Sequence, residues 1–258
     1  MKAAALFLMV LMTFSCKTHN DKRDHRGQMD AVIHEYVGRA SCAECHRMQH
    51  DLFQGSDHDM AMDIASEKTV LGDFNKSTFT HFGITSEFYK KDSSFFVLTE
   101  GPGGVMTEYK IEYTFGIRPL QQYLIEFPGG AYQCLPIAWD TRSAEEGGQK
   151  WFHLYGDEEI PYDDILFWTR PVQNWNYMCA ECHSTNLRKN YDLASNTYNT
   201  TWSEIDVSCE ACHGPASQHV EWAERVKNGA SPEIDADMGL VLRLKDTDTA
   251  TDSLLLAT

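Results

Sequence analysis

The pattern of hydrophobic and polar positions changes character along the chain. Residues 3–14 form an apolar run, with Thr13 as its one polar residue, behind Met1 and Lys2. The run is too short to span a bilayer and has the form of a secretory signal. Residues 76–155 instead alternate apolar and polar positions between turns rich in glycine and proline, which predicts an antiparallel β-module. The flanking segments carry only short helical stretches, so the pattern predicts an α+β fold of low regular structure.

Three copies of Cys-x-x-Cys-His flank the predicted β-module, one before it and two after it. This pentapeptide is the attachment site of a c-type haem, where two thiols bond to the porphyrin and the histidine binds the iron. The predicted haem-bonding cysteines are Cys42, Cys45, Cys179, Cys182, Cys209 and Cys212. The predicted proximal iron ligands are His46, His183 and His213. The sequence therefore predicts three covalently bound haems c, with short helices around the haem sites.

Zinc is the alternative occupant of a Cys-x-x-Cys pair. A zinc site uses two such pairs, and three pairs leave one without a partner. The spacer between the pairs at Cys179 and Cys209 is also longer than is usual in a zinc ribbon. Histidine follows all three pairs although only 11 of 258 residues are histidine. Haem is therefore favoured, and a zinc-binding structural module remains as an alternative.

The motifs divide the chain into six predicted segments. These are a signal peptide at 1–15, a flexible tether at 16–30, a first haem segment at 31–75, the inserted β-module at 76–155, a haem segment with two motifs at 156–227 and an irregular tail at 228–258. A capping box at Ser41 and Glu44 predicts one helix over 42–54, ending at Gly55. We expect the second and third motifs to form a close pair, with the first standing apart.

The apolar run at the N-terminus ends at Ser15 and Cys16, and charged residues begin at Lys17. A cysteine in this place resembles the cleavage site of a bacterial lipoprotein, although Thr13 stands where such signals usually carry leucine. Cys16 is then the acylated first residue of the mature chain, and cleavage by ordinary signal peptidase is the alternative. We expect an exported protein, either periplasmic or a lipoprotein of the outer membrane or cell surface of a bacterium. The remaining cysteine, Cys134, is predicted to be a small buried apolar residue.

Each haem iron needs a second axial ligand or else keeps an open site. The candidate distal ligands are His58, His153 and His219. His34, His50 and His81 are held in reserve, and Met60 or Met62 could replace His58. His50 lies four residues after His46 on one helix face, so it cannot bind the opposite side of the same iron.

Several stretches between residues 37 and 220 have distinctive sequences. They lie at 36–38, 56–62, 113–116, 119–124, 137–140, 149–155, 173–176, 182–186 and 209–215. Together they resemble the haem domain of a bacterial multihaem cytochrome c family, which includes the tetrahaem cytochrome c of nitrifying bacteria. The resemblance implies periplasmic or cell-surface electron transfer through haems with two histidine ligands, and it implies that His219 is one of them. Relatives usually carry further haem motifs and tetratricopeptide repeats downstream, so we expect this chain to be part of a longer protein.

Two functional classes remain open. One is an electron carrier whose haems are all six-coordinate, and the other is a reductase or oxidase with one open iron that acts on a small nitrogen or sulfur species. Three candidate distal histidines for three irons favour the carrier. The net charge of −16 argues against nucleic acid as a partner. The expected partners are redox proteins, among them other haem proteins, and a membrane reached through the lipid anchor.

Overall fold

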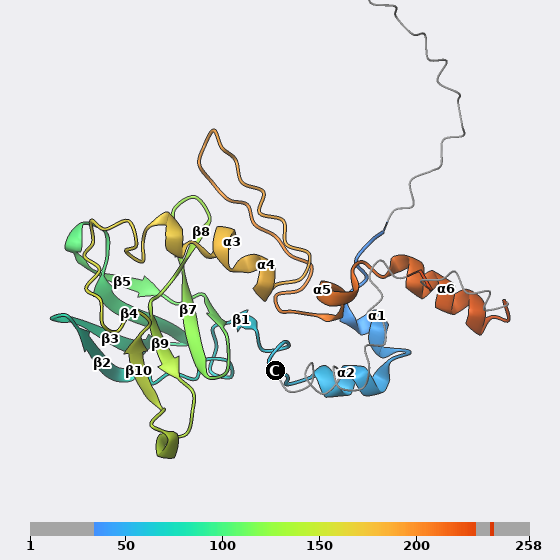
Figure 1. Ribbon diagram of the computed structural model, residues 1–258, viewed down its shortest axis with the longest axis horizontal. Helices are drawn as coiled ribbons and strands as arrows, with labels where there is room; N and C mark the ends of the chain where they lie inside the picture. Colours follow the sequence, from blue (N-terminus) through green and yellow to red (C-terminus); the bar gives the residue numbers. More distant parts are fainter. Residues whose placement is uncertain (1–33, 231–237, 240–258) are drawn as a thin grey trace, which may run out of the picture. The chain divides into compact units, whose positions relative to one another are not determined.

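The computed structural model describes residues 34–230, 238 and 239. The predicted signal peptide, Cys16, the predicted tether and most of the predicted tail lie outside the described residues. The helices are α1 (Arg39–Ala43), α2 (Arg47–Phe53), α3 (Trp175–Met178), α4 (Ala180–His183), α5 (Cys209–His213) and α6 (Ser217–Lys227), with short 3₁₀ turns at Pro102–Gly104, Ala144–Glu146 and Pro171–Gln173 (Figure 1). The predicted α+β fold with little regular structure is confirmed.

Two antiparallel sheets lie between the first and second haem motifs in the sequence. One has the order β2-β3-β4-β5 (Asn75–His81, Ile84–Lys91, Ser94–Glu100 and Met106–Lys110). The other has the order β1-β6-β7-β9-β10 (Met62–Ile64, Tyr113–Phe115, Leu120–Phe127, Ile137–Asp140 and Lys150–His153), and β8 (Ala131–Cys134) also pairs with β7. Phe82 and Gly83 both have positive φ in the two-residue turn between β2 and β3. That backbone is the hairpin turn whose twist matches the flanking strands.

A hydrophobic core draws side chains from both sheets. Phe88 and Val97 come from the smaller sheet, while Tyr123, Ile125 and Trp151 come from the larger one. The indole of Trp151 stacks on Phe88 with ring centres 3.7 Å apart. Along β4, β7 and β9 every second side chain enters this core, as the period-two pattern of the sequence predicts.

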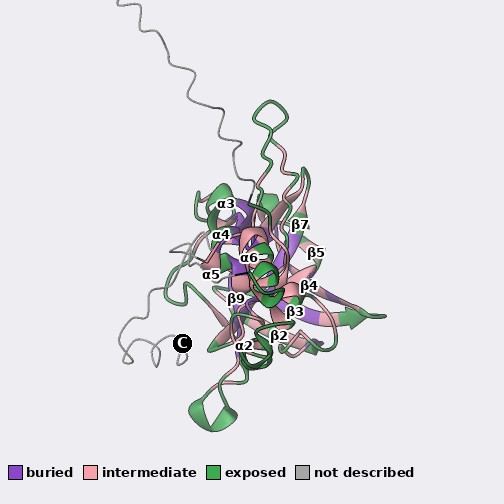
Figure 2. Cartoon of the chain, turned by 90° about the vertical axis from the view of Figure 1, so that its right-hand side faces the viewer, coloured by how far each residue is buried: buried purple, intermediate pink, exposed green. Residues whose placement is uncertain are grey.

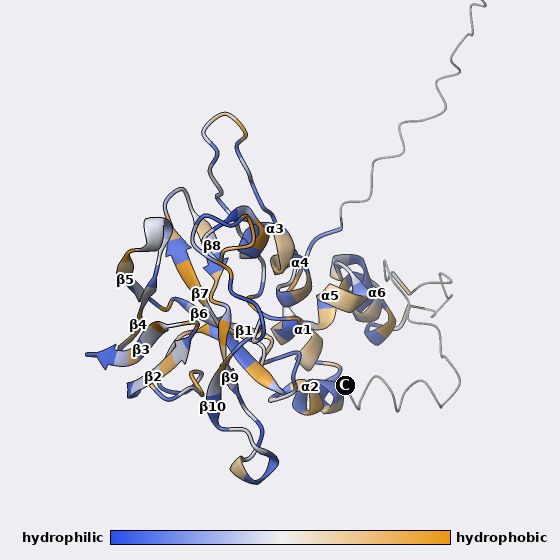
Figure 3. Cartoon of the chain, turned by 60° about the vertical axis from the view of Figure 1, so that its left-hand side comes forward, coloured by the Kyte–Doolittle hydropathy of each residue, from blue (hydrophilic) through white to orange (hydrophobic). Residues whose placement is uncertain are grey.

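The central strand β7 is buried on both faces. Tyr123 and Ile125 enter the core between the sheets, whereas Leu124 packs on the opposite face with Trp175 and Ala180 of the second haem segment. Figure 2 shows buried residues gathered in the strands, and Figure 3 shows strongly hydrophobic residues along β7. The larger sheet therefore packs on both faces. One face forms the core with the smaller sheet, and the other contacts the helices around the second motif.

The prediction of one helix over 42–54 is wrong, because the structure has two helices across this stretch, α1 and α2. Gly38 precedes the first helix with a φ of 79°, and Ser41 lies inside that helix instead of capping it. The Ser41 hydroxyl donates to the carbonyl of Val37, four residues back, which removes it from the predicted capping box. The helical backbone is then interrupted at His46, which directly precedes α2 and has a φ of −108°.

Within the described residues, no helix has both the length and the apolar character needed to cross a membrane. The helices α2 and α6 have no buried residue (Figure 2). Their position in the fold therefore depends on contacts at the haem motifs, which are described next.

Candidate haem-binding site

The first motif lies across the break between α1 and α2. Cys42 is half-buried in α1, whereas Cys45 and His46 are exposed in the connection. The amides of Cys45 and His46 both donate to the carbonyl of Cys42, at 3.2 and 2.8 Å. This tight turn places the two thiols and the imidazole on one short loop.

The second motif is held against the larger sheet by its histidine. Nδ1 of His183 lies 3.0 Å from the carbonyl oxygen of Ala61, just before β1, and the ring meets Phe115 edge-on. An imidazole that donates from Nδ1 to a backbone carbonyl presents an unprotonated Nε2, which is the form that binds a metal. The geometry of His183 therefore fits a proximal iron ligand.

The third motif forms α5, which begins after Ser208 and ends at Gly214 with a φ of 74°. Gly214 and the following Pro215 end the helix, and α6 then carries the chain in a new direction. His213 is the last residue of α5 and is half-buried. The helix α6, which contains His219, therefore follows the third motif directly in the sequence.

His219 faces the histidine of the first motif instead of that of the third. The rings of His46 and His219 have centres 6.1 Å apart and planes inclined by 23°. Nδ1 of His219 lies 2.9 Å from the carbonyl oxygen of Met238, and Trp222 flanks the ring at 5.7 Å. His219 therefore has the same hydrogen-bonded form as His183, with Nε2 free.

The separation of these two rings fits one iron between them. Each metal–imidazole bond is about 2 Å and each nitrogen lies about 1 Å from its ring centre, so two axial imidazoles place their ring centres roughly 6 Å apart. The observed 6.1 Å agrees with that distance. The residues present thus fit a haem between His46 and His219.

The other two candidate distal ligands lie elsewhere. His58 is exposed in the turn after α2, where its carbonyl accepts from the amides of Ala61 and Val207, both at 3.2 Å. His153 ends β10 and stacks on His81 with ring centres 4.0 Å apart. No contact found within the described residues joins either imidazole to a motif histidine. Their roles as distal ligands stay predictions.

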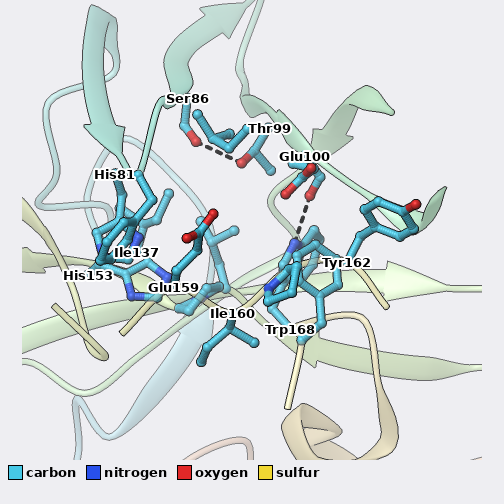
Figure 4. Close-up of a pocket in the computed structure, with 16 residues that line it drawn as sticks. His81, Ser86, Thr99, Glu100, Ile137, His153, Glu159, Ile160, Tyr162 and Trp168 are labelled. Carbon is cyan, nitrogen blue, oxygen red and sulfur yellow. Dashed lines mark hydrogen bonds between the residues drawn. The ribbon is translucent and has the colours of Figure 1, made fainter. Parts of the chain in front are cut away.

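His153 and His81 line one end of a cavity of about 260 Å³ in the β-sheet region (Figure 4). Glu159 lines the cavity beside them, whereas Trp168 lies on the other side, where its indole donates to the carbonyl of Glu100. Burial, together with the neighbouring His81, lowers the pKa of His153 to about 4. His153 is therefore neutral at physiological pH, and its Nδ1 accepts from the amide of Tyr155.

The first and third motifs are joined by a buried carboxylate. Glu210 stands inside the third motif, is only 1% exposed, and accepts hydrogen bonds from the amides of Val37 (3.0 Å), Gly38 (2.8 Å) and Ala216 (2.9 Å). The amide of Glu35 also donates to the Ser217 hydroxyl, and the amide of Ser217 returns a bond to the carbonyl of Glu35. The expectation that the first motif stands apart is wrong, because these bonds join the segment before α1 to α5 and α6.

Replacing Glu210 by alanine is expected to destabilise the folded chain by about 3 kcal/mol, since it leaves three amide donors without an acceptor in a buried place. Urea unfolding followed by tryptophan fluorescence measures this loss. Glu181→Ala is the matched control, because Glu181 lies in the second motif but is exposed. Equal stability of the two variants would contradict the proposed role of Glu210.

Arg39 makes a second connection between the same segments. Its guanidinium binds Glu204 at 2.7 Å, Asp59 at 2.6 Å and Asp206 at 2.5 Å. Burial acts to lower the pKa of Arg39, but the hydrogen bonds and charges of Asp206 and Glu204 outweigh it and raise that pKa. Arg39 therefore stays charged, and it holds the turn after α2 and the segment before α5 to the start of α1.

The sequence signals for these contacts differ. Between its two cysteines the third motif has glutamate before alanine, whereas the other two motifs have alanine before glutamate. This difference in order is the sequence signal that distinguishes Glu210. The partners of Arg39 are 20, 165 and 167 residues away and follow no periodicity, so sequence inspection had no means of finding them.

The cysteines also come together in pairs. The side chains of Cys42 and Cys209 lie within hydrogen-bonding reach of each other, and Sγ of Cys134 lies 3.9 Å from Sγ of Cys179. Within the described part of the chain, no group of three His, Cys, Asp or Glu side chains is arranged to hold a metal ion. The predicted burial of Cys134 is confirmed, at 2% exposure.

One family model of known proteins matches the part of the chain that contains two of the motifs. Residues 168–214, which contain the second and third motifs, match the family model described as cytochrome c554 and c-prime. The solved structure of an undecahaem cytochrome from the S-layer of Carboxydothermus ferrireducens aligns with 72% of this chain and 21% of that chain, at 20% identity and a TM-score of 0.40. No curated protein sequence matches the chain.

Proposed function

We propose that the chain is a multihaem c-type cytochrome, an exported electron carrier with three covalently bound haems; the match of residues 168–214 to the cytochrome c554 and c-prime model and the three Cys-x-x-Cys-His motifs support this. Covalent haem c and a role in electron transfer go with this family. The number of haems, their ligands and the location outside the cytoplasm are the parts that we propose. A bound haem supplies one iron that gains or loses one electron, and the protein sets its ligands and surroundings.

The observation that carries this proposal is the pair of imidazoles at His46 and His219. His46 and His219 would together hold one haem iron, which would then exchange electrons and have no open site for a small substrate. Each haem with two such ligands favours a carrier over a reductase or oxidase. For the second and third irons, His58 and His153 are retained as the candidates that the sequence suggests.

The connection between the first and third motifs supports electron transfer between haems. Cys42 and Cys209, which would each bond one haem, are in side-chain contact. Two haems attached to neighbouring sulfurs are close to each other, and Glu210 and Arg39 hold the backbone segments that carry them. These contacts would hold the first and third haems near each other.

Spectroscopy of the chain, produced in a host that attaches haem c, tests the proposed function. We expect three haems per chain by pyridine haemochrome assay and a low-spin spectrum for all irons. A high-spin fraction that binds nitrite or hydroxylamine would instead favour the reductase or oxidase. Bound zinc without covalent haem would overturn both and support the structural module.

Anchoring at Cys16 is a separate proposal, supported by the apolar run that precedes it. Cells grown with labelled palmitate are expected to incorporate the label into the wild-type protein but not into a Cys16→Ala variant. Secretion of unlabelled wild-type protein cleaved at another residue would indicate ordinary signal peptidase.

A further inference from the structure

Cys134 is a buried thiol beside a haem-attachment cysteine. It is the last residue of β8 and packs among Met62, Leu124 and Trp175. Its sulfur lies 3.9 Å from that of Cys179, the first cysteine of the second motif. A disulfide bond needs the two sulfurs about 2 Å apart, so a movement of roughly 2 Å would join them.

This contact differs from that between Cys42 and Cys209. Both of those residues belong to motifs, so haem attachment would use both sulfurs. Among the described cysteines, Cys134 alone lies outside a motif. Cys179 packs against the same apolar cluster that contains Cys134, which brings the two sulfurs together.

We propose that Cys134 is a disulfide-exchange site that holds Cys179 before haem is attached to the second motif. This inference rests on the proposed haem attachment at Cys179 and Cys182. It concerns the chain before attachment, in the oxidising compartment where exported proteins form disulfides. After attachment, the Cys179 sulfur is bonded to the haem and Cys134 remains a thiol.

The exchange consumes no reductant, because each disulfide that breaks is replaced by another. A protein disulfide first oxidises Cys179 and Cys182 to a disulfide and is itself reduced to a dithiol. The Cys134 thiol then loses its proton, a step made harder because its contact with Cys179 and its burial raise its pKa, and its sulfur attacks the Cys179 sulfur. The bond from Cys179 to Cys182 breaks, and Cys182 leaves as a thiolate that takes up the proton lost by Cys134. Cys182 is exposed, so the departing sulfur can move into solvent.

The consequence is a redox gate on the second motif. While Cys179 is bonded to Cys134, it cannot form a thioether to haem, and a thiol reductant must release it first. Cys42 and Cys209 of the first and third motifs also face each other, so a disulfide between those two residues would need reduction as well. Among the described cysteines only Cys134 lies outside a motif, so its removal is expected to change attachment at the second motif alone.

Disulfide mapping tests the exchange in the full chain, exported by cells in which haem attachment is limiting. Free thiols are blocked with N-ethylmaleimide at harvest, and the digested protein is analysed by mass spectrometry. In chains that lack haem at the second motif, we expect a peptide pair joined through Cys134 and Cys179, with Cys182 blocked by the reagent. A Cys179–Cys182 disulfide alone, with Cys134 blocked, would overturn the proposal.

Haem occupancy of each motif gives the second measurement. Cys134→Ala and Cys134→Ser are each expected to raise occupancy of the second motif several-fold under limiting attachment, without changing the first and third. Added thiol reductant is expected to remove the difference from wild type. Equal occupancy in wild type and both variants would contradict the gate, whereas absence of haem from all three motifs would contradict the proposed function instead.

Discussion

Replacing Cys209 and Cys212 together by alanine is expected to lower the covalent haem content from three haems per chain to two. Without these thiols no thioether forms at the third motif, while the other two motifs keep all their attachment residues. Intact-mass spectrometry shows the loss as the mass of one haem, and the pyridine haemochrome assay shows a fall of about one third because each motif contributes one equivalent.

Cys134→Ala, produced with abundant haem-attachment machinery, is the control for this prediction. It also removes a cysteine, but Cys134 belongs to no motif, so this variant should retain three haems. Three haems in the double variant, or the loss of one from the control, would show that the cysteines have been assigned incorrectly.

His219→Ala is expected to convert one iron of the holoprotein from low spin to high spin. His219 is the imidazole that faces His46 across 6.1 Å, so its removal opens the distal site of that iron. Low-temperature electron paramagnetic resonance should show about one third of the iron as a high-spin signal, because one of three haems has lost an axial ligand. The total haem content should not change, since the thioether bonds are intact.

Two further variants make this prediction specific. Glu221→Ala changes an exposed residue of the same helix and should leave all the iron low-spin. His219→Met keeps an axial ligand but should raise the reduction potential of that haem, because thioether ligation favours the reduced iron. An unchanged spectrum in His219→Ala would show that another residue binds opposite His46.

Local sequence was sufficient for the fold class and for locating much of the β-structure. Alternation of apolar and polar residues reports the two faces of a strand, and Phe95 and Val97 of β4 are buried as that alternation requires. The same approach failed at 42–54. The spacing of Ser41 and Glu44 is that of a capping box, in which the serine oxygen accepts from an amide, but Ser41 lies inside α1 and its hydroxyl donates to the carbonyl of Val37. Competing bonds of this kind are decided by backbone geometry that a motif does not contain.

The sequence by itself determined the chemistry predicted for this protein. Cys-x-x-Cys-His is a five-residue unit, so the residues proposed to bond each haem can be named without knowing the fold. Only the tertiary structure decided which distant groups meet: His219 opposite His46, Glu210 against the amides before α1, and Cys134 beside Cys179. These contacts join residues separated by 45 to 173 positions, as the pairs Cys134–Cys179, Gly38–Glu210 and His46–His219 illustrate. No local pattern encodes such separations, because they result from the way the sheets and short helices pack.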